Sequence, residues 1–380
     1  MLIDTLGKDI IDRYCTYLKC TGMFSGLSSE SDAPYINSRV AENAFCLVTG
    51  AENLGRADCS ADAKLGRTGI GIKTFLASNN KTMQKIAEFN RDAYMIRGKS
   101  PTDIIKIIAN LRNERILSTM RIYGLEGMIY HCIVREAMLI KVCEFPMETI
   151  DISNITNILV RNKGNAIYFS ERKNEYSFNL NKNTLYKRFD TTEPLISINV
   201  EILENPYSLL SSLIAYDTER KDETIKRNRE SVILPLFSDR GVRNVPKRSG
   251  LNQWNAGGRK RDNNEVYIPI PAWIHKKFPN FFPSRDDVFL LKLPNGNELS
   301  AKVCQDGSKA LMSNPNLALG KWLLREVMNL KEKELLTYER LQVIGIDSVE
   351  VYKITDKVFK IDFMPMGTYD RFVFKNRGTE

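Results

Sequence analysis

The feature that most constrains the fold is a basic stretch from Arg240 to Arg261, which holds seven Lys or Arg residues and no Asp or Glu. Glycines and asparagines punctuate it, so it reads as a connection rather than as a core element. A basic connection of this kind marks a boundary between two folded parts of the chain. With 380 residues, and roughly 100–200 residues per domain, we expect two domains joined by a flexible basic arm.

The charge of the whole chain agrees with a polyanionic partner. Lys and Arg number 55 against 46 Asp and Glu, which gives a net charge of +9. Hydrophobic residues make up 43% of the chain, enough for packed cores. No apolar run approaches the ~18–20 residues of a membrane span. We therefore expect nucleic acid as the partner, and no membrane.

Cysteine and histidine usage excludes several classes of site. The seven cysteines contain no CxxC pair, and there are only two histidines, His131 and His275, which argues against structural zinc. The odd cysteine count and the lack of a signal-peptide pattern lead us to expect a cytoplasmic protein. Gly69-Ile70-Gly71 is not followed by a GK[ST] motif, so no nucleotide cofactor is expected.

The patterns along the chain predict an α/β (α+β) domain over residues 1–235, the arm over 236–262 and a mainly β domain over 263–380. In the first domain we expect helices over 7–19, 39–48, 82–95, 101–111 and 205–214, strands between 116 and 189, and a charged end at 217–230. In the last, strand-like runs are expected at 266–270, 288–293, 299–304, 349–354, 358–363 and 371–374, with one helix over 317–328. Many short strands predict a small β-barrel.

One hairpin carries residues suited to phosphodiester chemistry. Residues 57–65 and 70–76 are extended segments joined by Gly66–Gly69. Centring the hairpin on Arg67 and Thr68 places Asp62 opposite Lys73, with Asp58 on the same face. A carboxylate can hold Mg²⁺, and a lysine can orient water or stabilise developing charge. A surface ion pair is the alternative interpretation.

This segment resembles the PD-(D/E)XK nucleases, which carry an Asp on one strand and (D/E)-x-K on the next. The chain departs from the pattern at Gly71, where the family has an acid. The EcoRII-like branch moves that acid onto the following helix, which implies Glu88 as its substitute here and as a second metal ligand beside Asp62. The same branch uses a Glu from an upstream helix, for which Glu42 is the candidate.

Two polar segments of the second half have side chains that can contact DNA. Lys and Arg bind phosphates, amides and Arg can read base edges, and Trp can pack on a sugar or base. The candidates in the arm are Arg248, Asn252, Gln253, Trp254, Asn255, Arg259, Lys260 and Arg261. Those in the connection between residues 304 and 320 are Gln305, Asp306, Lys309, Ser313, Asn314 and Asn316. An ordinary solvated linker is the alternative for the arm.

Residues 250–372 resemble the C-terminal DNA-recognition domain of certain type II restriction endonucleases, a pseudobarrel also found in plant B3 transcription factors. The resemblance rests on the segment from Glu265 to Val327 and on GIDSVEVYKI behind it. It implies that two loops, here Arg248–Arg261 and Gln305–Asn316, grip the major groove.

Taken together, these patterns predict a restriction-modification nuclease that cuts double-stranded DNA with Mg²⁺ at or near a short site. Cutting both strands requires two sites to be engaged, by a homodimer or by successive nicks. The alternative is a non-catalytic, sequence-specific DNA-binding regulator with a B3-like domain. A generic nucleic-acid-binding role would instead show affinity that falls steeply with salt and little sequence preference.

Overall fold

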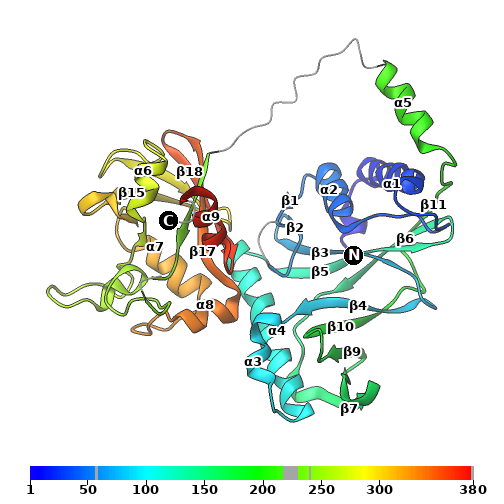
Figure 1. Ribbon diagram of the computed structural model, residues 1–380, viewed down its shortest axis with the longest axis horizontal. Helices are drawn as coiled ribbons and strands as arrows, with labels where there is room; N and C mark the ends of the chain where they lie inside the picture. Colours follow the sequence, from blue (N-terminus) through cyan, green and yellow to red (C-terminus); the bar gives the residue numbers. More distant parts are fainter. Residues whose placement is uncertain (56–58, 217–229, 239–240, 378–380) are drawn as a thin grey trace. The chain divides into compact units, whose positions relative to one another are not determined.

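The computed structural model describes residues 1–55, 59–216, 230–238 and 241–377. The chain forms two compact units (Figure 1). The first contains residues 1–55, 60–116 and 126–224, and the second mainly residues 117–125 and 225–380. In the described part, none of the helices combines the length and the apolar character needed to cross a membrane.

The first unit is built on a mixed six-stranded sheet in the order β1-β2-β3-β5-β6-β11. Its strands are β1 (Glu52–Asn53), β2 (Ala63–Leu65), β3 (Thr68–Leu76), β5 (Gly127–Glu136), β6 (Leu139–Pro146) and β11 (Ile196–Asn199). Strands β3 and β5 run parallel, and the other neighbours are antiparallel. A parallel pair needs a crossover connection, which here includes α4 (Pro101–Tyr123). Residues 117–123 of this helix group with the second unit.

Two helices cover one face of this sheet (Figure 1). They are α1 (Lys8–Met23) and α2 (Ser38–Thr49), as the apolar spacing predicted. Asn37 caps α2 by accepting a hydrogen bond from the Val40 backbone N–H at 2.9 Å. Tyr14 and Phe45 pack on Ile70 and Ile72 of β3, so the even-numbered side chains of β3 form the core on this face.

A second, antiparallel sheet follows the order β4-β10-β9-β8-β7. Its strands are β4 (Lys81–Glu88), β10 (Thr184–Asp190), β9 (Asn174–Asn179), β8 (Ala166–Glu171) and β7 (Ile155–Arg161). The hairpin of β8 and β9 is confirmed. The helix expected over 82–95 is wrong, because β4 occupies most of that range and only η3 (Asn90–Asp92) and the short α3 (Ala93–Ile96) are helical. β4 pairs with β10, about a hundred residues later, and such a distant partner leaves no local pattern.

The remaining helix of the first unit is α5 (Pro206–Tyr216), which confirms the helix expected near residue 205. The charged segment that follows it, 217–229, lies outside the described residues, as does Arg240 in the basic arm.

The second unit is a mostly β, nearly closed barrel. Its seven strands follow the order β12-β17-β18-β14-β15-β16-β13, and the first and last strands of that order contact each other. They are β12 (Ser231–Pro235), β13 (Ile268–Pro269), β14 (Val288–Lys292), β15 (Glu298–Cys304), β16 (Ala310–Ser313), β17 (Ile346–Thr355) and β18 (Val358–Pro365). The helical segments are η7 (Gly250–Asn255), α6 (Ala272–Lys277), η8 (Asp306–Ser308), α7 (Ala318–Gly320), η9 (Lys321–Val327), α8 (Tyr338–Ile344) and α9 (Thr368–Arg377). This confirms the barrel that the run of short strands predicted.

Two details of this unit differ from expectation. β12 pairs with β17, so the boundary expected at residue 235 lies inside the second unit. The strand expected at 371–374 is wrong, because these residues belong to α9. Tyr369, Phe372 and Val373 have the spacing of one helical face and pack against Ile233 and Phe237.

Candidate active site and nucleic-acid interface

Asp62 and Lys73 meet beside the hairpin of β2 and β3. The Asp62 Oδ2 atom accepts a hydrogen bond from the Ile72 backbone N–H at 2.7 Å and lies 4.0 Å from Lys73 Nζ. The two side chains are 27% and 30% exposed, so both remain accessible. Burial raises the pKa of Asp62, and the Lys73 charge and the Ile72 N–H oppose that rise. The result is a carboxylate–lysine pair that solvent can still reach.

The hairpin register differs from the expected one by two residues. Ala63 pairs with Ile70 and Leu65 with Thr68, so the turn is centred on Gly66 and Arg67. Asp62 therefore does not stand directly opposite Lys73. A shift of two residues keeps every side chain on its face, which is why the pair still forms. Asp58 lies outside the described residues.

Glu42 of helix α2 interacts with this pair through its charge. Its side chain is buried, and its Oε2 atom accepts a hydrogen bond from Arg39 Nη1 at 2.8 Å. Burial raises the pKa of Glu42, and the charge of Asp62 raises it further, while Arg39 and Lys73 lower it. The charges of Glu42, Asp62, Lys73 and Arg39 therefore act on one another. We call Glu42, Asp62 and Lys73 the acidic cluster.

Glu88 lies elsewhere than expected. It is the last residue of strand β4, not part of a helix, and its carboxylate is bound by Lys85 Nζ at 3.0 Å and by the Asn90 amide. It is not among the groups whose charges act on Asp62. The charge of Glu42 thus interacts with that of Asp62, whereas Glu88 is held in a surface ion pair.

Little space is available for a side chain at Gly71, the position at which the PD-(D/E)XK pattern has an acid. A Cβ atom at this position would lie 2.4 Å from the Cε atom of the buried Met147 and 3.5 Å from the Tyr130 ring. Any side chain here requires Met147 to move. Gly71 and Lys73 share a face of β3 by the two-residue period, so this space adjoins the cluster.

The donor atoms of the acidic cluster suit a hard cation. Glu42 and Asp62 supply carboxylate oxygens, and Mg²⁺ commonly binds through one or two carboxylates while keeping several waters. Within the described ranges, no group of three or more His, Cys, Asp and Glu residues is arranged to hold a metal ion. Two carboxylates are few protein ligands, so a hard cation here would take most of its coordination from water and substrate.

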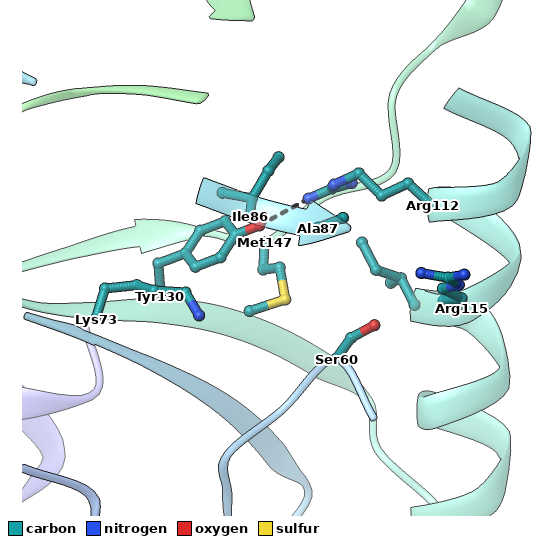
Figure 2. Close-up of a pocket in the computed structure, with 9 residues that line it drawn as sticks. Ser60, Lys73, Ile86, Ala87, Arg112, Arg115, Tyr130 and Met147 are labelled. Atoms are coloured by element: carbon teal, nitrogen blue, oxygen red, sulfur yellow. Dashed lines mark hydrogen bonds between the residues drawn. The ribbon is translucent and has the colours of Figure 1, made fainter. Parts of the chain in front are cut away.

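A small open cavity lies next to Lys73 (Figure 2). β3 contributes Lys73, β4 contributes Ile86 and Ala87, and β5 contributes Tyr130. Among the described residues, the lining is Ser60, Lys73, Ile86, Ala87, Arg112, Arg115, Ile116, Tyr130 and Met147. No sequence motif marked Arg112 and Arg115, although their spacing places both on one face of α4.

Much of the described basic arm is folded and held by hydrogen bonds and ion pairs. Residues 250–255 form the 3₁₀ helix η7. The buried carboxylate of Glu265 is paired with Arg259 and with Arg261 Nε at 3.6 Å. Arg261 also donates hydrogen bonds to the carbonyl oxygens of Ala256 and Gly257, both at 3.0 Å. Arg261 therefore holds the arm in shape.

The arm candidates separate into structural and exposed residues. Asn252 is 0% exposed, and its amide bonds the Pro246 carbonyl and both the N–H and C=O of Leu336, so it is a core residue and not a base reader. Gln253 donates to Glu265, Trp254 is partly buried, and Asn255 donates to the Lys247 carbonyl. The candidates whose side chains stay exposed are Arg248, Asn255, Arg259 and Lys260.

The segment 305–316, which was expected to be a single loop, forms two loops. Strand β16 lies inside it and separates residues 305–309 from residues 314–316. Ser313 is 1% exposed, and its hydroxyl accepts the Leu319 N–H, so it is structural. Gln305 is partly buried, whereas Asp306, Lys309, Asn314 and Asn316 are exposed. Asp306 pairs with Arg285 at 3.6 Å.

Only one of these loops lies with the arm. β13 pairs with β16 so that Ile268 faces Leu311 and Pro269 faces Ala310. Because the two strands are antiparallel, the residues that precede β13, toward Glu265, lie at the Ser313 end of β16. Arg325 donates hydrogen bonds to Asn263 and Asn264 of this preceding segment. The 305–309 loop instead lies with α6, where His275 contacts the Ser308 carbonyl.

No curated protein matches the chain. A family model does match part of it. Residues 228–355, which lie within the second unit and contain strands β12 to β17, match the NgoFVII C-terminal B3-like DNA-binding domain, a domain of a restriction enzyme family.

Proposed function

We propose that the protein is a type II restriction endonuclease, which binds a short DNA sequence through its second unit and hydrolyses phosphodiester bonds of double-stranded DNA with its first. The match to a B3-like DNA-binding domain supports the binding. The acidic cluster supports the hydrolysis, and the observation that carries it is Asp62 Oδ2 at 4.0 Å from Lys73 Nζ on the neighbouring strand.

In this proposal the first unit is a variant PD-(D/E)XK nuclease. Asp62 and Lys73 take the positions of the family's strand Asp and strand Lys. Glu42 from α2 takes the place of the acid absent at Gly71. This assigns the second carboxylate to Glu42 instead of Glu88, because the charge of Asp62 acts on Glu42.

The chemistry expected at the cluster follows from these groups. Mg²⁺ held by Asp62 and Glu42 would polarise the phosphate and acidify a water. Asp62 is kept in place by the Ile72 N–H, which fixes its carboxylate against β3. The Lys73 ammonium stands where it can stabilise the charge that develops on the phosphate oxygens.

In the second unit, the exposed side chains nearest to the arm are the proposed DNA contacts. Arg248, Arg259 and Lys260 supply charge for phosphates, and Asn255, Asn314 and Asn316 supply amides that can read base edges. Because residues 305–309 lie with α6, three of the expected contacts, Gln305, Asp306 and Lys309, lie away from the arm.

A digest tests the proposal directly. A sequenced plasmid is incubated with the full chain and Mg²⁺, and the fragment ends are mapped. Discrete fragments with a shared end sequence support the proposal. A sequence-specific gel shift without cleavage at any Mg²⁺ concentration would overturn the nuclease assignment and favour a DNA-binding regulator, the function that the departure at Gly71 also permits.

A further inference from the structure

The cavity beside the acidic cluster is lined by cations. Lys73 reaches it from β3, and Arg112 and Arg115 reach it from α4 (Figure 2). The polar groups of Ser60 and Tyr130 complete its polar side, and its described lining contains no Asp or Glu. The rest of the wall is apolar. A surface of this kind selects for an anion.

Arg112 is the unusual member of this group. It is 3% exposed, yet its guanidinium donates to neutral acceptors, the Glu148 carbonyl oxygen at 2.8 Å and the Tyr130 hydroxyl at 2.9 Å. Buried charges are normally paired with an opposite charge, because desolvation is costly. Figure 2 shows the Arg112 guanidinium and the Tyr130 hydroxyl side by side at the cavity.

The positive charge extends behind the cavity. Lys187 of β10 is buried, and its amine lies 5.9 Å from the Tyr130 ring centroid. The charge of Arg112 acts against that of Lys187, whereas Glu148 and Glu171 act in its favour. These two carboxylates, and Asp92 that pairs with Arg115 at 2.6 Å, are not among the residues that line the cavity. These carboxylates partly offset the positive charge around the cavity, but they do not occupy the cavity itself.

Gly71 keeps this space free of a carboxylate. A side chain there would point at Met147 and Tyr130, both of which line the cavity. An acid at the position that the PD-(D/E)XK pattern prescribes would place its own negative charge among Lys73 and the arginines. In this chain the corresponding space stays available to an anion from outside.

We propose that this cavity binds a phosphate group of the DNA strand next to the bond that is cut, with Arg115 and Arg112 as positioning residues. The inference rests on the proposed nuclease function. Lys73 borders both places, since it lies 4.0 Å from Asp62 and also lines the cavity. A phosphate held in the cavity would therefore fix the strand relative to the acidic cluster.

The first test measures anion binding without DNA or metal. Inorganic phosphate is titrated into the full chain and followed by ³¹P NMR. We expect saturable binding that Arg115→Gln weakens about tenfold, the equivalent of about 1.4 kcal/mol. Asp62→Ala should bind phosphate at least as tightly as the unsubstituted chain, and so should Lys106→Gln, which removes an exposed charge from the same helix.

Arg112 is tested with the conservative Arg112→Lys, because removing a buried, bonded guanidinium endangers the fold. This variant keeps a charge but replaces the planar fork of donors, whose two Nη atoms bond Glu148 and Tyr130, with a single ammonium nitrogen. We expect weaker phosphate binding with an unchanged circular dichroism spectrum. Absence of saturable binding in the unsubstituted chain, or equal binding by Arg115→Gln, would overturn the proposal.

The second test asks whether the phosphate comes from DNA. Duplexes that carry the mapped recognition site receive one neutral methylphosphonate at each position flanking the cut. One position should slow cleavage by the unsubstituted chain, and Arg115→Gln should show no additional loss at that position. If inorganic phosphate binds but no position couples to Arg115, the cavity serves free phosphate and the DNA assignment falls. If no DNA is cut at all, the nuclease proposal fails, while the phosphate titration still decides whether the anion site exists.

Discussion

Lys73 Nζ lies 4.0 Å from Asp62 Oδ2, although the two residues are not partners in the hairpin register. Their contact depends on β3 presenting every second side chain to the same face. Neither side chain belongs to the apolar core that packs on β3. We therefore expect the proposed hydrolysis to be separable from the stability of the hairpin.

The first prediction concerns this pair. Asp62→Ala and Lys73→Ala should each reduce Mg²⁺-dependent cleavage by on the order of 10²–10³ or more, since each removes a group that acts on the developing charge. Gel-shift affinity for the recognition sequence should stay unchanged. Arg67→Ala, at the turn of the same hairpin, is the matched control and should cut normally. Cleavage by Asp62→Ala at the unsubstituted rate would show that the site is misassigned.

The second prediction separates the two candidate acids. Glu42→Gln should raise the Mg²⁺ concentration needed for half-maximal cleavage, because a carboxylate that interacts with Asp62 is lost. Glu88→Gln, which removes one side of the exposed ion pair with Lys85, should leave that concentration unchanged. The reverse pattern would restore Glu88 as the metal ligand.

The titration of this pair offers a check without DNA. The charge of Asp62 raises the pKa of Glu42, so Asp62→Asn should lower it, as followed by NMR of ¹³C-labelled Glu carboxyls. Both carboxyls have raised pKa values, and only their ionised forms bind a cation. Mg²⁺ affinity should therefore fall as the pH drops, beginning above the usual carboxyl range. A Glu42 pKa that stays unchanged in Asp62→Asn would show that the two groups do not interact.

The local patterns predicted the helices of the first unit, and they failed where distant contacts decide. Asn37 caps α2 and Ser100-Pro101 begins α4, and both signals lie within a few residues of their effect. Strand β4 was mistaken for a helix because its partner β10 is remote in sequence. The position expected for Glu88 was wrong for the same reason, because it was inferred from a helix that does not form.

Burial explains the other differences. Side-chain type made Asn252 and Ser313 candidates for base contacts, but both are satisfied by backbone groups of the core. Composition identified the arm, yet it could not show that two of its arginines pair with the single carboxylate of Glu265. Arg112 and Tyr130 come from elements joined only by folding, so no motif marked the cavity.

A third prediction follows from Asn252. Its amide bonds buried backbone groups of Pro246 and Leu336, so Asn252→Ala should cost about 2–4 kcal/mol of unfolding free energy, because buried groups lose their partners. The base preference of the protein should stay the same. Arg259→Ala and Lys260→Ala should instead weaken DNA binding for all sequences, and a residue that contacts one phosphate should reduce the salt slope by about 0.9. Urea unfolding and gel shifts at several salt concentrations test both statements, and altered base preference in Asn252→Ala would contradict the first.

The last prediction concerns Lys187, whose side chain is 8% exposed. Burial first, and the charge of Arg112 second, lower its pKa to about 8, although Glu148 and Glu171 oppose the change. The unfolded chain, with a lysine pKa of about 10.4, then binds more protons than the folded chain between these two values. Between about pH 8 and pH 10, the contribution of Lys187 to the unfolding free energy therefore rises with pH.

Lys187→Met removes this buried charge at similar volume. It should raise the unfolding free energy at pH 7 by on the order of 1–3 kcal/mol, and the gain should shrink as the pH rises from 8 toward 10. Urea unfolding at pH 7 and pH 9.5 measures the difference. Lys85→Met, at an exposed position of the neighbouring strand, should show no comparable pH-dependent gain. A gain of equal size at both pH values would mean that packing, and not the buried charge, is responsible.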